Sequence, residues 1–303
     1  MKSTRKAYGE FLVEQGKKDR DIVVFDADLA AATCTNMFRD NFKDRHFDIG
    51  ISEQDMIGTA CGMAMSGKKV FASTFAIFMA GRAYEQIRNT AAYSHVNINL
   101  CATHSGIAVG EDGPTHQCIE DIALMNVIPT MKVLCPADDI STKKILSMCL
   151  NEDGPKYIRL SRNELPEIYS DEVEFKLGHS NVFGNGKDGT IFAVGNTVNI
   201  ALDAKNELKE KGIDVRVVDL YSIKPVDVDT IINCAKETNT LISIEDHSII
   251  GGIGSIISNV LCKEYPKKLV KIGINDTFGK SGSVKDVYNL FGLTKENIIK
   301  QFV

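Results

Sequence analysis

The sequence predicts an α/β protein of two domains, each built on a mostly parallel sheet flanked by helices. Short apolar runs rich in β-branched residues alternate with helical windows along nearly the whole chain. This alternation pauses over residues 166–186, where acidic residues and glycines accumulate, and then resumes. We therefore expect a first domain at residues 1–165, a linker at 166–186 and a second, smaller domain at 187–303.

The strands expected in the first domain are short and apolar. They lie at residues 21–25, 47–49, 69–72, 96–101, 132–134 and 157–160. Helical periodicity between them predicts helices from Ser52 to about Gly67, from about Ala80 to Tyr93, and from about Asp139 to Leu150. Ser52 is a residue type that caps helices, and acidic residues follow it in the first turn.

The second domain repeats the same alternation. Strands are expected at residues 190–195, 215–218 and 241–244, and helices at 197–211, 228–238 and 252–265. Because a helix separates each strand from the next, the strands can run in the same direction. A second parallel sheet is therefore predicted.

Composition narrows the class of protein. The chain has 303 residues, 44% of them hydrophobic, and a net charge of −5, so it offers no basic patch for nucleic acid. No apolar run approaches the roughly 20 residues of a membrane span, and no apolar stretch follows the basic N-terminus as in a secretory signal. The eight cysteines form no Cys-x-x-Cys pair, which indicates buried free thiols. We expect a cytoplasmic protein without a membrane or nucleic-acid partner.

The segment Gly106–Gln117 is the most informative part of the chain. It combines glycines with Glu111, Asp112 and His116, and His104 lies just upstream of it. The loop follows the strand expected at 96–101, and α/β proteins place ligand-handling groups in loops that leave strands. This composition suits a polyhydroxylated or phosphorylated small molecule.

This loop, together with Asp48–Gln54 and Ser73–Phe75, resembles the transketolase family of thiamine diphosphate enzymes. Two further pieces, Asp26–Leu29 and Leu160–Arg162, occur in the family order, as does an arginine near the start of the chain. The resemblance covers nearly all of the chain. It implies the family's pyrimidine-binding domain followed by its C-terminal domain.

A second implication concerns a partner. Transketolases bind the diphosphate through Mg²⁺ in a further domain that carries a Gly-Asp-Gly motif, and this chain has no Gly-Asp-Gly. The resemblance therefore implies a separate N-terminal, diphosphate-binding subunit that supplies the Mg²⁺ ligands. It also implies self-association through the pyrimidine-binding and C-terminal domains, and a heterotetramer with active sites shared between subunits.

The resemblance assigns four residues to the cofactor. Glu53 matches the catalytic glutamate that bonds the pyrimidine ring nitrogen, which requires a carboxyl group able to share a proton. Phe75 and Phe78 match the aromatic wall on which that ring stacks. Asp28 matches a position near the cofactor. The alternatives are a helix N-terminal acid for Glu53, ordinary core packing for the phenylalanines and a local cap for Asp28.

Five further residues match sugar-handling positions. Asp112 would accept a hydrogen bond from a substrate hydroxyl, and His116 would contact the reacting carbonyl and shuttle protons. His104, Arg162 and Arg5 would bind the substrate phosphate, because guanidinium groups bond phosphate in a bidentate manner. The alternative for each arginine is a surface ion pair. We expect no metal site in this chain, because no third ligand accompanies the two histidines in register.

Some positions depart from the family pattern, and the role of others is not decided by the sequence. Gly81 stands where some members have a third aromatic residue, and Arg82 and Tyr84 beside it could serve the pocket or an interface. Ala32 replaces a serine that often completes the phosphate site. The string Glu245–Ser248, followed by glycines, is interpreted as close packing at a subunit interface.

The function implied is two-carbon ketol transfer from a ketose phosphate such as xylulose 5-phosphate to an aldose phosphate, as in the pentose phosphate pathway. Two alternatives share the cofactor: half of a 1-deoxyxylulose 5-phosphate synthase, and the β subunit of a 2-oxoacid dehydrogenase. The histidine loop favours the transketolase. A third alternative is a non-catalytic scaffold subunit of the same fold, against which the intact Glu53 argues.

Overall fold

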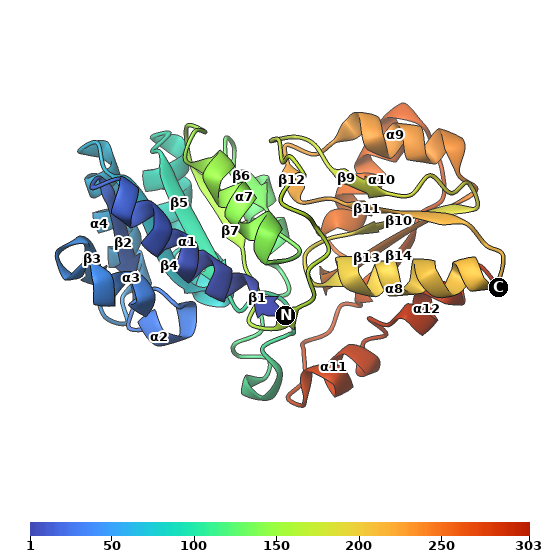
Figure 1. Ribbon diagram of the computed structural model, residues 1–303, viewed down its shortest axis with the longest axis horizontal. Coiled ribbons are helices and arrows are strands. Elements are labelled where there is room, and N and C mark those ends of the chain that lie inside the picture. The colour runs from blue at the N-terminus through green and yellow to red at the C-terminus, as the bar shows by residue number, and fades with distance from the viewer.

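The computed structural model describes residues 1–303 and contains a seven-stranded sheet, a five-stranded sheet and a two-stranded ribbon. The two large sheets form two lobes that lie side by side, each with helices against its faces (Figure 1). This arrangement confirms the predicted fold class of two α/β domains.

The seven-stranded sheet belongs mainly to the first domain. Its strands, in spatial order, are β12 (Ser222–Lys224), β6 (Lys132–Leu134), β7 (Lys156–Arg159), β5 (Ile98–Thr103), β4 (Lys69–Phe75), β2 (Ile22–Asp26) and β3 (His46–Asp48). All neighbours are parallel except the pair β12 and β6. β2 and β5 are buried along their whole length, as expected for parallel strands covered on both faces.

The first domain's helices only partly follow the prediction. The α-helices are α1 (Thr4–Lys18), α2 (Ala30–Thr33), α3 (Asn36–Asn41), α4 (Glu53–Met65), α5 (Tyr84–Gln86), α6 (Asp121–Val127) and α7 (Asp139–Cys149). The helix predicted near 80–93 begins earlier and consists largely of the π-helical segments Ile77–Arg82 and Ile87–Tyr93. Ser52 precedes α4 as predicted, but its side chain makes no capping hydrogen bond, so that expectation was wrong.

The five-stranded sheet forms the second domain, with strand order β14 (Val270–Ile274), β13 (Thr240–Ser248), β10 (Gly189–Ala193), β11 (Val215–Asp219) and β9 (Asn181–Phe183). Its helices are α8 (Thr197–Glu210), α9 (Val228–Glu237), α10 (Ile253–Glu264), α11 (Val284–Leu290) and α12 (Lys295–Ile299). β9 pairs antiparallel with β11 although it lies inside the expected linker 166–186, so the end of that segment is part of this sheet.

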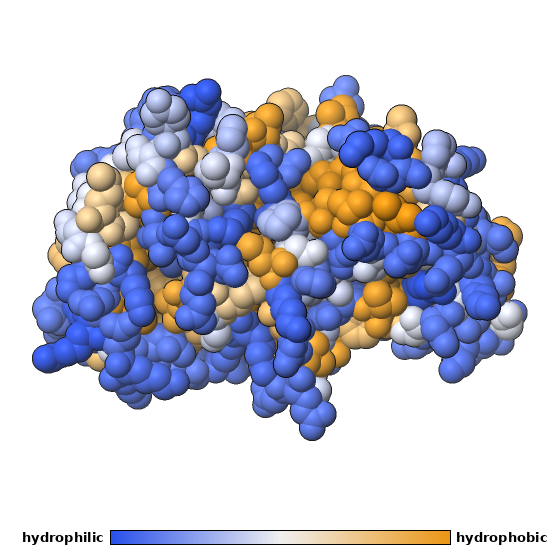
Figure 2. Space-filling view, turned by 90° about the horizontal axis from the view of Figure 1, so that it is seen from above, coloured by the Kyte–Doolittle hydropathy of each residue, from blue (hydrophilic) through white to orange (hydrophobic).

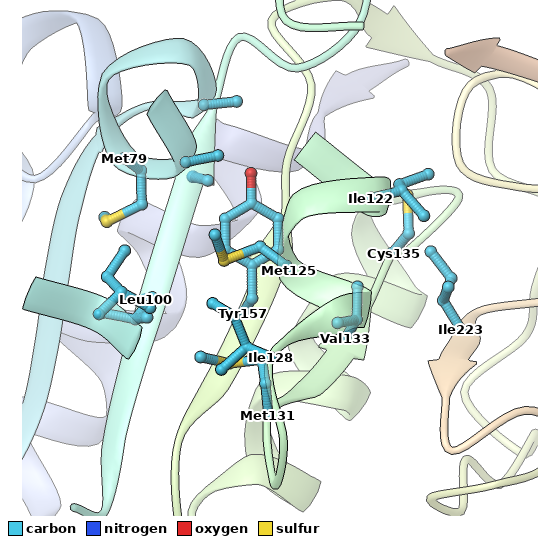
Figure 3. Close-up of a cluster of buried hydrophobic side chains, with 14 of the residues drawn as sticks. Met79, Leu100, Ile122, Met125, Ile128, Met131, Val133, Cys135, Tyr157 and Ile223 are labelled. Atoms are coloured by element: carbon cyan, nitrogen blue, oxygen red, sulfur yellow. The ribbon is translucent and has the colours of Figure 1, made fainter. Parts of the chain in front are cut away.

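Two strand pairs tie distant parts of the chain together. β1 (Lys2–Ser3) pairs with β8 (Glu164–Leu165) at the end of the first domain. β12 comes from the second domain in sequence but pairs with β6 of the first. The side chain of Ile223 on β12 accordingly joins the core cluster that contains Val133 and Tyr157 (Figure 3).

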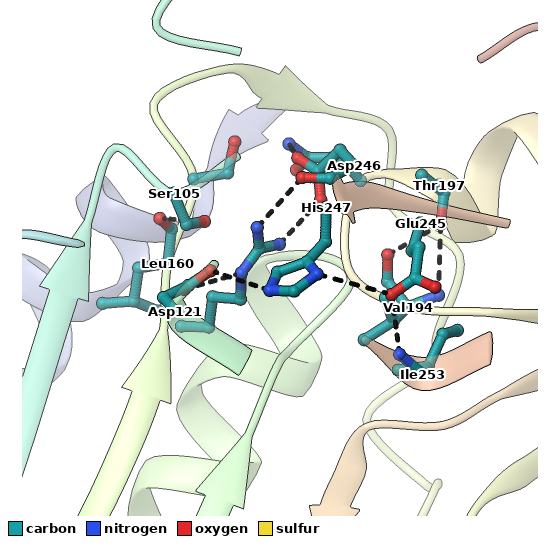
Figure 4. A network of polar contacts seen from close by, with 12 residues as sticks. Ser105, Asp121, Leu160, Val194, Thr197, Glu245, Asp246, His247 and Ile253 are labelled. Atoms are coloured by element: carbon teal, nitrogen blue, oxygen red, sulfur yellow. Dashed lines mark hydrogen bonds and ion pairs between the residues drawn. The ribbon is translucent and has the colours of Figure 1, made fainter. Parts of the chain in front are cut away.

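A buried polar network crosses the boundary between the domains (Figure 4). Arg159 on β7 donates from Nε to Asp121 at 2.9 Å and from Nη1 to Asp246 on β13 at 2.7 Å. Next to it, Glu245 accepts hydrogen bonds from the N–H groups of Ile253 and Gly254 at the start of α10. Glu245, Asp246 and His247 are thus buried within one chain, beside the boundary between its domains, and packing of this string at a subunit interface stays a prediction.

The surface is mixed. Seen from above, hydrophobic residues gather near the middle of the molecule, toward the C-terminal lobe, among hydrophilic residues (Figure 2). All eight cysteines are free thiols, and Cys262 is the exposed one. None of the helices is both long enough and apolar enough to cross a bilayer.

Candidate active site

The candidate site forms at the carboxyl ends of the parallel strands of the first domain, the edge where open α/β sheets bind ligands. Phe75 is the last residue of β4, and His104 directly follows β5. Glu53 is the first residue of α4, which follows β3. Residues that are far apart in sequence therefore meet because their strands end at one edge.

Glu53 is buried and paired. Its side chain is 1% exposed, and both carboxylate oxygens accept from Nη1 of Arg82, at 2.8 and 2.7 Å. The Arg82 side chain is 47% exposed, and its guanidinium carbon lies 4.6 Å from the centre of the Phe78 ring. A buried carboxylate requires such a charged partner. Arg82 thus belongs to the pocket.

Four aromatic rings form one contiguous array. The rings of Phe75 and Phe78 are nearly parallel, with centroids 5.8 Å apart and an interplanar angle of 10°. The His104 ring stacks on Phe75 with centroids 3.8 Å apart. His116 meets both phenylalanines edge-on, at 6.3 and 5.7 Å. Two residues predicted for the cofactor and two predicted for the substrate are therefore in direct contact.

His104 is a neutral imidazole in this setting. Burial lowers its pKa to about 3, and the nearby positive charges of Arg5 and Arg162 act in the same direction. Nε2 lies 3.4 Å from Nη1 of Arg5, and Nδ1 lies 2.9 Å from the Thr103 hydroxyl. Because an arginine can only donate, Nε2 accepts and Nδ1 carries the proton, which it donates to Thr103. His104 can therefore orient a ligand but brings no charge.

Two arginines and one carboxylate lie around this array. Arg5 donates to the carbonyl of Ala32 at 2.7 Å, and its buried Nε has no hydrogen-bond partner. Arg162 donates from Nη1 to the carbonyl of Val109 at 2.9 Å and to Asp112 at 3.3 Å. Both guanidinium groups keep donors that no protein atom uses, as anion binding requires.

Asp28 stands apart from the other predicted residues. It is exposed, and its backbone N–H donates to the carboxylate of Asp48 at 2.9 Å. Its own carboxylate makes no hydrogen bond with a member of the aromatic array. The structure contains no group of three or more His, Cys, Asp or Glu side chains that could hold a metal ion.

A cavity of about 1000 Å³ adjoins the site at the boundary between the domains. Thr115 and Gln117 line it from the first domain, and the loop 276–281 lines it from the second. The hydroxyl oxygen of Thr115 lies 2.9 Å from Nδ1 of His116, so the cavity extends to a residue that contacts the aromatic array. The sequence did not predict this contribution of the second domain, because nothing in loop 276–281 marks it as a neighbour of residue 115.

Comparison with known proteins places these features in a family. The family "Transketolase, pyrimidine binding domain" matches residues 1–167, and "Transketolase, C-terminal domain" matches residues 178–298. A putative transketolase C-terminal section of Methanocaldococcus jannaschii is 45% identical over 305 residues, covering 100% of this chain and 96% of that protein. One subunit of the apulose-4-phosphate transketolase of Phocaeicola vulgatus is 37% identical, covering 99% and 96%.

Longer relatives match over part of their length. The transketolase of Homo sapiens is 36% identical over 98% of this chain but only 48% of its own. Among solved structures, a split-gene transketolase described as an inactive beta4 tetramer superposes with a TM-score of 0.92 at 43% identity, covering 99% and 97% of the two chains. These matches confirm the resemblance that the motifs predicted. The chain belongs to the transketolase family and comprises its pyrimidine-binding and C-terminal domains.

Proposed function

We propose that this chain is one subunit of a two-chain transketolase that uses thiamine diphosphate and transfers a two-carbon ketol unit from a ketose phosphate to an aldose phosphate. The observation that carries the proposal is a contact series that runs from Glu53 through Arg82 to Phe78 and Phe75, and from them to His104 and His116. Relatives of matching length are named as a section or subunit of a transketolase, which supports a separate partner.

The residues present fit an aminopyrimidine ring. Such a ring needs a buried carboxyl group for its nitrogen and an apolar wall for its face, and Glu53 and the parallel Phe75 and Phe78 provide both. Thiamine diphosphate, when bound, supplies the electron sink that stabilises a carbanion. Glu53 would hold the ring nitrogen and the proton shared with it. The Mg²⁺ ligands are proposed to lie on the partner subunit.

The substrate would occupy the other end of the array. Nδ1 of His116 is hydrogen-bonded to the Thr115 hydroxyl. Nε2 of His116 would therefore be the atom that bonds the reacting carbonyl or hydroxyl of the substrate and exchanges a proton with it. Asp112 would accept from a substrate hydroxyl. Arg5 and Arg162 would bind the terminal anion, with the neutral His104 orienting it. One relative is named for 6-deoxy-6-sulfo-D-fructose, a sugar whose sulfo group is also an anion.

The wider setting follows from this proposal. A site with one half on each polypeptide fits a heterotetramer of two such chains and two partner chains. We propose that the reaction belongs to carbohydrate metabolism, such as the pentose phosphate pathway, and that it takes place in the cytoplasm. Asp28 stays proposed as a residue near the cofactor, since it lies in the turn after β2 at the same edge of the sheet.

The proposal is tested by isolating the chain with its partner from the host, measuring bound thiamine diphosphate, and assaying cleavage of xylulose 5-phosphate. Glu53→Gln in the reconstituted complex should lower kcat by at least about 100-fold, the usual worth of a proton-transferring group. The control is Glu85→Gln, which removes an exposed carboxylate bonded to Gln86. Full activity of Glu53→Gln would disprove the catalytic assignment. Turnover of pyruvate with an acyl-carrier partner would instead support a 2-oxoacid dehydrogenase.

A further inference from the structure

Arg82 occupies the place that the proposed function gives to the pyrimidine ring. Its Nη1 donates to both oxygens of Glu53, at 2.8 and 2.7 Å. Its guanidinium carbon lies 4.6 Å from the centre of the Phe78 ring. A guanidinium is flat, cationic and rich in N–H donors, and it stacks on aromatic faces. An aminopyrimidine is also flat, donates N–H bonds and stacks on the same kind of ring.

The two groups cannot use Glu53 in the same way at once. The Glu53 side chain is 1% exposed, whereas the Arg82 side chain bonded to it is 47% exposed, so Arg82 connects the buried carboxylate with the surface. Both oxygens are already hydrogen-bonded to one nitrogen of Arg82. A ring nitrogen that is to bond Glu53 must therefore displace at least one of these contacts.

Arg82 is free to leave. Its side chain is 47% exposed, and Glu53 is its only hydrogen-bond partner, so no other polar contact holds it. Open space lies beside the backbone at this point, because a Cβ atom placed on Gly81 would meet only Cδ1 of Ile77, at 3.8 Å. Gly81 therefore brings no side chain of its own beside Arg82, whose side chain is already 47% exposed.

We propose that Arg82 competes with the cofactor for Glu53: it pairs with Glu53 when no ring is bound, and it turns outward when a flat heteroaromatic ring shares a proton with Glu53 through its ring nitrogen. This inference rests on the proposed function. Arg82 keeps the buried carboxylate compensated before the cofactor arrives, and it sets how tightly a ring must bind in order to enter.

The test uses the reconstituted two-subunit complex with saturating Mg²⁺ and measures thiamine diphosphate binding by isothermal titration calorimetry. Arg82→Met keeps an apolar stem but removes the competing cation, and we expect Kd to fall roughly ten-fold, the scale of a partly exposed ion pair plus a cation–π contact. Arg88→Met is the matched control, because Arg88 is exposed and bonds only its neighbour Asn89. Its Kd should equal that of the unchanged complex.

A chemical complementation keeps the test independent of one variant. In Arg82→Ala, added methylguanidinium should compete with the cofactor and raise its Kd, whereas the unchanged complex should not respond. Kd values for Arg82→Met that equal or exceed the unchanged value, or the absence of competition in Arg82→Ala, would overturn the inference. If the unchanged complex binds no thiamine diphosphate, the proposed function fails as well. If it binds and the variants bind no tighter, only the role of Arg82 fails.

Discussion

Replacing Arg159 by methionine should test how strongly the two domains depend on one buried cation. The Arg159 side chain is 1% exposed, and those of Asp121 and Asp246 are 0% exposed. Its three hydrogen bonds, at 2.9, 2.7 and 3.1 Å, join α6 and β7 of the first domain to β13 of the second. Burial raises the pKa of Asp246, and the Arg159 charge opposes that rise.

The expected cost follows from this burial. Methionine fills a similar volume but leaves two buried carboxylates without their cation, and breaking a buried ion pair costs about 3–5 kcal/mol of unfolding free energy. Urea denaturation followed by circular dichroism measures the change. Arg39→Met is the control, because the Arg39 and Asp40 side chains are 47% and 61% exposed and such a pair contributes at most about 1 kcal/mol.

Neutralising the acids should reverse the effect. Adding Asp121→Asn and Asp246→Asn to Arg159→Met removes the unpaired charges, so at least half of the lost stability should return. The reasoning is refuted if Arg159→Met costs less than about 1 kcal/mol, the range of an exposed pair. It is also refuted if the triple variant is no more stable than the single one, because the loss would then come from packing.

Two further predictions concern stability. Burial raises the pKa of Asp219 to about 8, and the Tyr169 hydroxyl donates to its carboxylate at 2.6 Å. Protonated Asp219 therefore stabilises the folded state fully below its ordinary pKa of 3.8, and this stabilisation is lost as the pH rises through 8. Between pH 6 and 8 the free energy of unfolding, measured with urea, should fall less steeply for Asp219→Asn than for the unchanged chain, by up to about 1.4 kcal/mol per pH unit. Equal slopes for the two proteins would contradict this. A Cβ on Gly106 would lie 2.1 Å from the carboxylate of Asp246, whereas one on Gly67 would meet no atom within 4 Å, and both residues have positive φ. Gly67→Ala should cost only about 1–2 kcal/mol of backbone strain, and Gly106→Ala clearly more; equal melting temperatures would show that the Gly106 loop adapts.

The parallel strands were predictable because they are buried on both faces and therefore read as continuous apolar runs, as β2 and β5 do. The helix α1 was not among the predicted helices, although its buried residues Ala7, Tyr8, Phe11 and Leu12 recur at helical spacing and the sequence therefore carried its signal. The placement of β12, in contrast, was not predictable. A three-residue segment carries no information about which of two sheets it will join.

Some residues of the candidate site could be predicted from the sequence and others could not. The residues of the array follow strand ends and family motifs, so their sequence positions indicate their meeting point. Arg82 lies 29 residues from its partner Glu53 at the end of the π-helical segment Ile77–Arg82, and the sequence left open whether it served the pocket or an interface. Glu245, Asp246 and His247 show another difficulty, because their charge suggests a contact surface whereas all three are buried within the chain.

The pairing of β12 with β6 determines where this chain tolerates being divided. A fragment ending within residues 166–186 would lose β12 and Ile223, and β6 would become the uncovered edge of the sheet. Exposed strand edges with apolar faces promote aggregation. The pyrimidine-binding domain therefore depends on sequence that lies beyond its own family boundary at residue 167. A cut between the two family domains would remove part of the first domain's sheet, so we expect the two domains to fold as one unit.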